Sequence, residues 1–222
     1  MEQQIIEIRN ISSSTNTDEA FRTLRTNLMY IDDLKVITIS SSSPNEGKTV
    51  TAFNLAYQFA QLGKRVVLVD ADMRRSSLRS YLMLKDKVSG LSEALSRQSR
   101  NYLFPTNVDN LFVILSGKNP PNPSELLSSP IFDQLISALK ENFDYVIIDT
   151  APMAVSMDAT IVGRKSDGLV MVIRNEMTRK KNLRRIRADL ERNGVRLVGA
   201  VLNRVKKNQI DYGDYRYEKY YE

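Results

Sequence analysis

Residues 35–51 read KVITISSSSPNEGKTVT and decide the fold of this chain. A short apolar run comes first, a loop of small residues follows, and Gly47-Lys48-Thr49 opens a helical pattern. Where a strand runs into the start of a helix, backbone N–H groups and the positive end of the helix dipole face one point. Such a point favours an anion, so this stretch predicts a phosphate-binding loop.

Each member of the loop has an expected role. The Lys48 ammonium would reach the β- and γ-phosphates of a nucleotide, the Thr49 hydroxyl would bind Mg²⁺, and Gly47 lets the backbone approach closely. The usual pattern has a glycine five residues before Gly47, where this chain has Ser42. The prediction therefore depends on the order of strand, loop and helix. The remaining predicted nucleotide contacts in the loop are Ser43, Pro44, Asn45, Glu46 and Val50.

Composition limits the chemistry that this chain can perform. The 222 residues suit one α/β domain with a sizeable core. Cysteine, histidine and tryptophan are all absent, which excludes disulfides, Cys/His zinc sites and His-dependent catalytic triads. Catalysis must rest on carboxylates, lysine, arginine or hydroxyls. No apolar run approaches the roughly 18 residues of a membrane span, and no signal-peptide core is present at the N-terminus, so we expect a cytoplasmic protein.

The charge of the chain is basic, with a formal net charge of +6. This charge permits an anionic partner but does not select one. Much of the surplus lies within residues 178–193, where Leu183, Ile186 and Leu190 share one face of a helical pattern. We interpret the basic side chains there as the solvated face of a helix.

Two more apolar runs end in aspartates. Residues 65–70 form a β-branched run that delivers Asp70 and Asp72, and residues 145–148 lead into Asp149 in the form of a Walker B element. In a parallel sheet the carboxyl ends of the strands form the ligand-binding edge. Neighbouring carboxylates at that edge favour a bound cation, and Mg²⁺ is the natural candidate. Asn203 follows the last predicted strand, where its amide would bind adenine.

Helices alternate with buried strands along the whole chain. The pattern predicts helices near 16–30, 48–62, 91–97, 130–142, 158–165 and 178–193, with a short one from 124, and strands near 35–39, 65–70, 111–115, 145–148, 169–174 and 197–202. We therefore expect a P-loop NTPase-type α/β fold, a mostly parallel sheet with helices on both faces. The expected organisation is a flexible arm over 1–16, the main domain over 17–207 and a tail over 208–222.

The two ends of the chain carry distinct patterns. Asn16 with Glu19 resembles a capping box, and Glu19, Arg22 and Arg25 recur at a spacing of three on one helix face. The tail holds five of the ten tyrosines, interleaved with acidic residues, and lacks the apolar face of a strand or buried helix. We predict that this tail is mobile. Its tyrosines are Tyr212, Tyr215, Tyr217, Tyr220 and Tyr221.

The motifs of this chain, taken together, resemble those of a known family, the bacterial tyrosine kinases or BY-kinases. The similarity is to the separate cytoplasmic kinase subunit of capsular and exopolysaccharide systems in Gram-positive bacteria, and it covers essentially the whole length. It rests on SPNEGKT, VVLVDADMR, VIIDTAP, the ExxRxxR spacing, PPNPSELL and the tyrosine-rich tail. This chain departs from the family pattern at Asn45, Ser76 and Ala151, none of which is a charged or magnesium-binding position.

The resemblance implies transfer of the γ-phosphoryl group of ATP to tyrosine, with Mg²⁺ as cofactor. Asp70 is our choice for the group that accepts or orients the phenol proton, although the sequence leaves Asp72 open as an alternative. The catalytic residues implied are Lys48, Asp70, Asp72, Arg74 and Asp149. The metal ligands implied are Thr49, Asp70, Asp72 and Asp149.

The resemblance also implies an assembly. It predicts a homo-oligomeric ring with Glu19, Arg22 and Arg25 at the contact, in which the five tail tyrosines are phosphorylated between subunits. A transmembrane activator would recruit the chain to the inner face of the membrane, and a cognate phosphatase would remove the phosphates. No nucleic acid partner is expected.

Two other classes of protein remain as alternatives. A partitioning or septum-site ATPase shares this fold, but such proteins usually carry a second lysine early in the loop, where residues 40–43 are all serine here, and they lack the tyrosine tail. A noncatalytic nucleotide-binding adaptor would leave the carboxylates idle.

Overall fold

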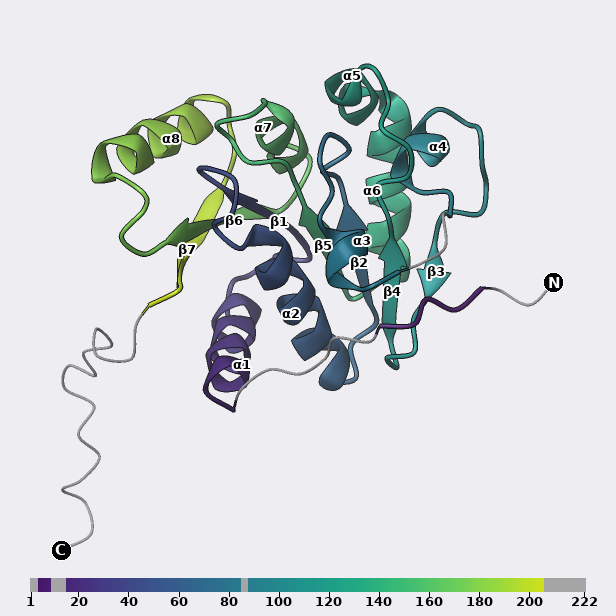
Figure 1. Cartoon of the computed structure of the whole chain (residues 1–222), viewed down its shortest axis with the longest axis horizontal. Helices are drawn as coiled ribbons and strands as arrows, with labels where there is room; N and C mark the ends of the chain where they lie inside the picture. Colours follow the sequence, from purple (N-terminus) through teal and green to yellow (C-terminus); the bar gives the residue numbers. More distant parts are fainter. Residues whose placement is uncertain (1–3, 9–14, 85–87, 206–222) are drawn as a thin grey trace, which may run out of the picture.

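A computed structural model describes residues 4–8, 15–84 and 88–205 of the chain (Figure 1). The predicted tail over 208–222, with its five tyrosines, lies outside the described residues, as does part of the predicted arm. None of the helices in the described ranges has the length and apolar character that spanning a membrane requires.

The core of the molecule is a seven-stranded sheet in the order β3-β4-β2-β5-β1-β6-β7. All neighbouring strands pair in parallel except β3 and β4, which are antiparallel. The strands are β1 (Val36–Ser41), β2 (Val66–Asp70), β3 (Phe104–Pro105), β4 (Leu111–Ile114), β5 (Tyr145–Asp149), β6 (Gly168–Arg174) and β7 (Leu197–Asn203).

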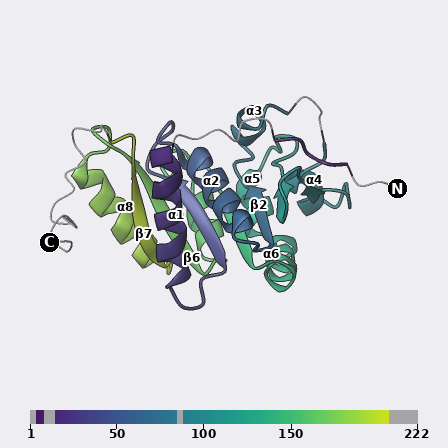
Figure 2. The ribbon, with the colours of Figure 1, turned by 90° about the horizontal axis from the view of Figure 1, so that it is seen from below.

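Helices cover both faces of this sheet. Side chains of α1, α2 and α3 pack on one face, whereas those of α4, α5, α6 and α7 pack on the other, which α8 also covers beside β6. Figure 2 shows α1 beside α2, and α8 at the end of the molecule that β7 forms. The helices are α1 (Thr15–Met29), α2 (Lys48–Gln61), α3 (Leu78–Tyr81), α4 (Leu91–Leu95), α5 (Pro123–Ser128), α6 (Pro130–Asn142), α7 (Asp158–Gly163) and α8 (Lys180–Arg192).

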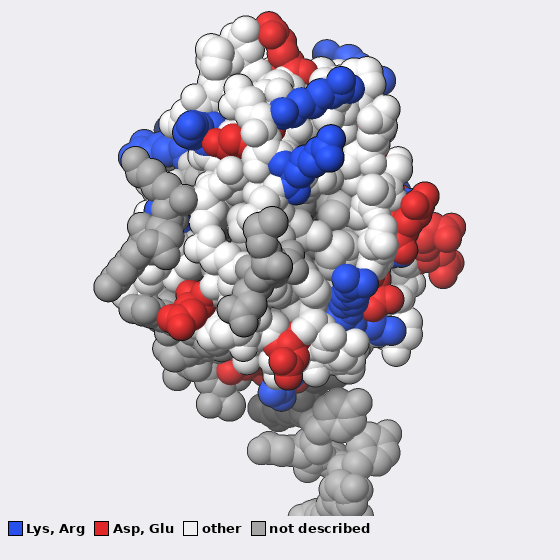
Figure 3. Space-filling model, turned by 90° about the vertical axis from the view of Figure 1, so that its right-hand side faces the viewer, with Lys and Arg blue, Asp and Glu red and all other residues white. Residues whose placement is uncertain are grey.

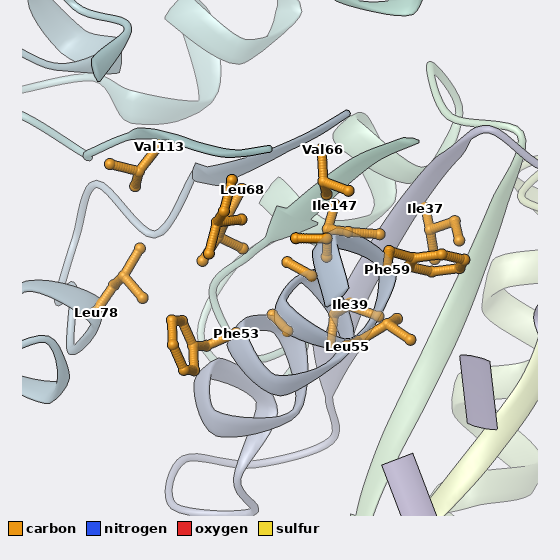
Figure 4. Packing of buried hydrophobic residues seen from close by; sticks show 14 of the residues in the cluster. Ile37, Ile39, Phe53, Leu55, Phe59, Val66, Leu68, Leu78, Val113 and Ile147 are labelled. Carbon is orange, nitrogen blue, oxygen red and sulfur yellow. The ribbon is translucent and has the colours of Figure 1, made fainter. Parts of the chain in front are cut away.

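The alternation of strand side chains explains this layering. Successive residues of a strand point to opposite faces, so Ile37 and Ile39 of β1 face α2, where they lie in one cluster with Phe53 and Phe59 (Figure 4). Val36 belongs to the cluster on the opposite face. All of these side chains are buried, and each stabilises the fold by about 1.5–3 kcal/mol relative to an exposed position.

The predicted fold class is confirmed, and two local predictions are wrong. The helix α1 begins at Thr15, so Asn16 is a helical residue and the predicted capping box is wrong. The predicted loose arm is wrong for residues 6 and 8, since Ile6 and Ile8 are buried and the Ile6 N–H donates to the Pro105 carbonyl at 2.9 Å. These two isoleucines alternate along the chain, which gives the segment one apolar face. The short elements α3 and β3 were not predicted.

Candidate active site

Three adjacent strands bring the predicted site residues to one edge of the sheet. Asp70 ends β2 and is the register partner of Asp149, which ends β5. On the other side of β5 lies β1, and the loop that follows β1 leads to Lys48 at the start of α2 (Figure 1). The parallel arrangement therefore places the phosphate-binding loop directly beside both aspartates.

The buried side chain of Glu46 stabilises the phosphate-binding loop through hydrogen bonds. Its carboxylate accepts hydrogen bonds from the Ser42 hydroxyl at 2.8 Å, from the Ser43 N–H at 3.0 Å and from the Thr178 hydroxyl. Glu46 is only 1 % exposed, and these three donors compensate for removing its side chain from water. Only its backbone remains to contact a nucleotide. Pro44, Asn45 and Val50 are exposed at the rim of the loop.

Asn203 fixes the turn into α2. Its side-chain amide donates to the Glu46 carbonyl at 2.9 Å, so it lies against the phosphate-binding loop, and its contact with adenine stays a prediction. A Cβ atom at Gly47 would lie 2.0 Å from Asn203 Nδ2, and Gly47 has φ +99°, so only glycine fits there. Asn45 has φ +64°, a conformation that asparagine tolerates better than most residues. This accounts for asparagine at the position where the family usually has glycine.

Lys48 lies between two carboxylates. Its Nζ atom is 3.0 Å from Asp72 Oδ2 and 3.4 Å from Asp149 Oδ1. Burial lowers the pKa of Lys48, but the charges of Asp149 and Asp72 outweigh burial and hold this pKa above its ordinary value. The ammonium therefore stays charged, and each of these carboxylates has a cationic partner within reach.

Asp70 is the most enclosed group of the cluster. It has no solvent exposure, its Oδ1 atom accepts the Asp72 N–H at 3.2 Å, and its Oδ2 atom accepts the Ser76 hydroxyl. Burial, with the charge of Asp149 as the next cause, raises the pKa of Asp70 to about 7. Burial also raises the pKa of Asp149. Ser76, which sequence reasoning noted only as a departure from the family, is thus a direct neighbour of the expected base.

Thr49 and Asp149 supply oxygens suited to Mg²⁺. The Thr49 hydroxyl donates to Asp149 Oδ2 at 2.6 Å, and the Ser77 hydroxyl donates to Thr49 at 2.9 Å. Across the described residues, no three carboxylates are arranged to enclose a metal ion. Mg²⁺ at nucleotide sites usually takes one or two protein oxygens together with water and phosphates, so this donor pair fits that ion.

Arg74 joins a second polar group. Its guanidinium donates to Asp158 Oδ2 at 2.8 Å and to the Ser124 hydroxyl at 2.8 Å, while Ser124 donates to Asp158 Oδ1 at 2.5 Å. Although burial opposes the shift, the hydrogen bonds from Arg74 and Ser124 hold the pKa of Asp158 below its usual value. The structure thus joins Arg74 to α5 and α7. The sequence did not indicate the contacts of Asp158 and Ser124 with Arg74, because each of these two residues stands out only as the start of a predicted helix.

The three residues of the ExxRxxR spacing lie on α1, away from this cluster. Glu19 and Arg22 are exposed and form an ion pair of 3.7 Å. Arg25 is half-buried and donates to the Gln58 carbonyl of α2 at 3.2 Å. Within the described part of the chain, none of the three has a hydrogen bond or ion pair with the carboxylate cluster.

The fold and the loop define the chain as a P-loop nucleotide-binding protein, and residues 34–192 match the family model described as an AAA domain. The chain is 37% identical over 201 residues to the tyrosine-protein kinase CpsD of Streptococcus pneumoniae, which covers 89% of this chain and 88% of CpsD. It is 36% identical over 207 residues to the tyrosine-protein kinase wzc of Salmonella typhimurium, which covers 91% of this chain and 29% of wzc.

A solved structure agrees with these relatives. The kinase domain of the Escherichia coli tyrosine kinase ETK superposes with a TM-score of 0.83 at 33% identity, over 90% of this chain and 79% of that chain. The chain therefore belongs to the bacterial tyrosine kinases, and the enzyme class that this membership carries is protein-tyrosine kinase.

Proposed function

We propose that this chain transfers the γ-phosphoryl group of ATP to tyrosine hydroxyls, including those of its own tail. The observation that carries this proposal is the convergence of Lys48 with Asp70, Asp72 and Asp149 beside the phosphate-binding loop. Phosphoryl transfer needs positioning and charge stabilisation more than covalent chemistry, and this edge of the sheet supplies both.

Lys48 and the loop amides bind the phosphates of ATP. In the step, the tyrosine oxygen forms a bond to the γ-phosphorus while the bond from that phosphorus to the β–γ bridging oxygen breaks and ADP leaves. Lys48 would move from Asp72 and Asp149 toward the phosphates, where its charge stabilises the transferring group. Bound Mg²⁺, held by Thr49 and Asp149, would neutralise charge on the β- and γ-phosphates.

Asp70 is the group that accepts the phenol proton in this proposal. Its pKa of about 7 suits a base that works near neutral pH, and its Oδ2 atom already accepts a hydrogen bond from a hydroxyl group, that of Ser76. In the proposed step a tyrosine hydroxyl would take the place of the Ser76 hydroxyl, which donates to Asp70 Oδ2 in the nucleotide-free chain. A phenol has a pKa near 10, so a modest base suffices once the geometry is fixed.

Phosphorylation between subunits is the form of the reaction that we propose. Because Tyr212 and the other four tail tyrosines follow β7 at the edge of the sheet, a neighbouring subunit offers them a direct route into an active site. We propose a ring in which exposed Glu19 and Arg22 of α1 contact the next subunit. The kinase unit would span residues 17–207, together with the docked residues 6 and 8, and the substrate tail residues 208–222.

The partner of this chain would be a membrane protein of capsular or exopolysaccharide export. This chain matches only 29% of wzc, so that relative joins its kinase-like part to a much longer chain. We propose that a separate transmembrane activator supplies the equivalent of the remainder, recruits the kinase to the inner face of the membrane and raises its activity. A phosphotyrosine phosphatase would reverse the modification.

The proposal is tested by following ADP release and phosphotyrosine together in purified protein with Mg-ATP. A kinase forms phosphotyrosine in proportion to ADP until the tyrosines are filled, whereas a partitioning-type ATPase releases ADP without phosphotyrosine. The Lys48→Met variant, which keeps the tail, is the control and should form neither product. Steady ADP release by the wild type without phosphotyrosine would favour the ATPase alternative.

A further inference from the structure

The helix α8 has a strongly basic outer face. Leu190 is buried, and Leu183 and Ile186 are half-buried on the side toward the sheet. The helix lies at the end of the molecule that β7 forms (Figures 1 and 2). Away from this apolar side, α8 carries six exposed basic side chains together with exposed Asn182, Ala188 and Glu191 and half-buried Asp189. The basic side chains are Lys180, Lys181, Arg184, Arg185, Arg187 and Arg192.

Four of these cations lack an acidic partner. Arg187 pairs with Glu191 at 2.7 Å and Arg192 pairs with Asp189 at 3.5 Å. Of the carboxylates in the described ranges, none lies within ion-pair distance of the other four. They form two neighbouring rows along the helix, Lys180 with Arg184 and Lys181 with Arg185, because residues four apart lie on the same side. We call these four residues the α8 basic face.

This arrangement is unfavourable for α8 itself. The first turn holds no acidic residue, so Lys180 and Lys181 oppose the helix dipole, and the like charges of each row repel one another. On the side of the molecule where β3 and α4 lie, Lys and Arg are instead scattered together with Asp and Glu over a largely uncharged surface (Figure 3). This charge pattern destabilises α8 and brings the fold no compensating contact. Such a feature indicates a binding function, and the ligand of a basic face would be a polyanion.

The chain itself supplies a suitable polyanion close by. β7 ends at Asn203, whose carbonyl accepts the Asn175 N–H at 2.9 Å, and Asn175 lies in the connection that leads from β6 to Lys180. Tyr212 follows nine residues after Asn203, and an extended chain of that length reaches about 30 Å. The 13 residues of α8 are about 20 Å long. The tail can therefore reach the whole helix of its own chain.

Phosphorylation would make the tail a much stronger ligand for this face. Residues 211–222 contain four acidic and two basic residues, so their formal charge is 2 − 4 = −2. Each phosphotyrosine adds about −1.5 to −2 charges and three strong acceptor oxygens, which suit arginine in particular. The apolar side of α8 packs in the core, so only its charged side is available to a ligand. The helix therefore has no free apolar side with which to insert into lipid.

We propose that the α8 basic face binds the phosphorylated tyrosine tail of the chain. The proposal rests on the proposed function insofar as that function produces the phosphorylated tail. Docking would hold the modified tail beside its point of exit and away from a neighbouring active site, so the face would act as the receptor for the product of the kinase.

Binding can be measured without kinase activity. The five-fold Tyr→Phe chain, without ATP, is titrated with a labelled synthetic peptide of residues 207–222 carrying five phosphotyrosines, and fluorescence anisotropy gives Kd. We expect the phosphorylated peptide to bind at least about tenfold more tightly than the unphosphorylated one. Lys181→Glu with Arg185→Glu should weaken its binding at least about tenfold. The matched control is Arg97→Glu with Arg100→Glu, two exposed cations near α4, which should bind like the parent.

Several results would overturn the proposal. Equal binding of the two peptides would do so, as would equal binding to the α8 and control variants. Binding of anionic lipid vesicles that depends on α8, without a preference for the phosphorylated peptide, would assign the face to a lipid surface. Failure of docking in a chain that still forms phosphotyrosine leaves the proposed function standing. If the chain binds the phosphorylated peptide but forms no phosphotyrosine with Mg-ATP, the α8 basic face is confirmed as a binding site and the kinase proposal is refuted.

Discussion

The environment of Asp70 destabilises the folded chain when this carboxyl group is ionised. It is fully buried, and two further carboxyl groups, those of Asp149 and Asp72, lie close to it. Lys48, with its Nζ atom at 3.0 Å and 3.4 Å from those two neighbours, compensates in part. Groups held in costly environments cluster at functional sites, and a carboxyl of raised pKa beside a phosphate-binding loop fits that rule.

The stability of the nucleotide-free chain should fall as the pH rises through the titration of Asp70. An unfolded aspartate titrates near pH 3.9, whereas Asp70 in the folded chain titrates near 7. Between about pH 4 and 7 the folded state therefore holds a proton that the unfolded state has lost, so this group lowers the free energy of unfolding with rising pH. Asp70→Asn should remove that dependence and stabilise the chain at pH 8 by on the order of 3 kcal/mol.

Urea unfolding of wild type and Asp70→Asn at pH 5 and pH 8, with EDTA and without nucleotide, measures this effect. Asp158→Asn is the opposite case, because the pKa of Asp158 is lowered and its ionised form stabilises the fold. That variant should be destabilised at both pH values. An Asp70→Asn chain less stable than wild type at pH 8 would show that ionised Asp70 is not costly.

Ser76 and Glu46 show which residues a sequence alone cannot assign. The continuous apolar runs placed Asp70 and Asp149 correctly at the ends of buried strands, since that pattern is local. The contact of Glu46 with Thr178 joins residues 132 positions apart, and that of Ser76 with Asp70 spans six residues of an irregular turn, so no regular spacing encodes either contact. The same holds for Arg74 and Asp158, which are 84 positions apart.

The loop between β1 and α2 depends on a single glycine. Gly47→Ala would force a Cβ atom to 2.0 Å from Asn203 Nδ2 and would hold alanine at φ +99°. We expect the affinity for a fluorescent ATP analogue to fall at least about tenfold, which corresponds to about 1.4 kcal/mol. Adding Asn203→Ala should recover part of the loss, because it removes the clash but not the backbone strain. Unchanged affinity in the single variant would contradict this account of the loop.

The helix α1 separates two roles within the ExxRxxR spacing. Arg22 is exposed, and its ion pair with Glu19 is worth only a few tenths of a kcal/mol, so Arg22→Glu should leave the melting temperature nearly unchanged. If α1 forms the ring contact, the same change should dissociate the assembly. Light scattering and thermal unfolding measure the two effects, with Arg100→Glu as the control.

Arg25→Glu is expected to act differently. It would remove the bond to Gln58 and place a carboxylate in a half-buried position against α2, so it should lower the melting temperature as well as perturb assembly. An assembly that keeps its mass after Arg22→Glu would show that the ring contact lies elsewhere.

The alternation of helices and strands predicted the elements and the mostly parallel sheet, because both depend on local periodicity. The short elements α3 and β3 were not predicted, because they are too short to show a local periodicity. β3 has two residues and exists through its pairing with β4, and α3 has four residues that pack on the core. Tertiary contacts decide such elements, whereas local propensity decides the long ones.

For the whole molecule, tail phosphorylation should control assembly. Three phosphotyrosines would add about −4.5 to −6 charges to the tail, comparable in size to the formal net charge of +6 of the entire chain. Such a tail would be repelled from a site that holds ATP phosphates and aspartates. Wild type in Mg-ATP should therefore dissociate and reassemble after phosphatase treatment, while the five-fold Tyr→Phe variant should stay assembled. Sedimentation velocity measures this, and a fully phosphorylated wild type that keeps its mass would refute the switch.

The central claim is that this sheet edge phosphorylates the tail of another subunit. The direct measurement mixes Lys48→Met, which has a complete tail, with the five-fold Tyr→Phe chain, which has a complete active site, in Mg-ATP. Mass spectrometry should find phosphotyrosine within residues 212–221 of the Lys48→Met chain in the mixture, and none in either variant incubated alone. Absence of tail phosphotyrosine in the mixture, under conditions in which wild type acquires it, would contradict transfer between subunits. Its absence from wild type as well would contradict the kinase itself.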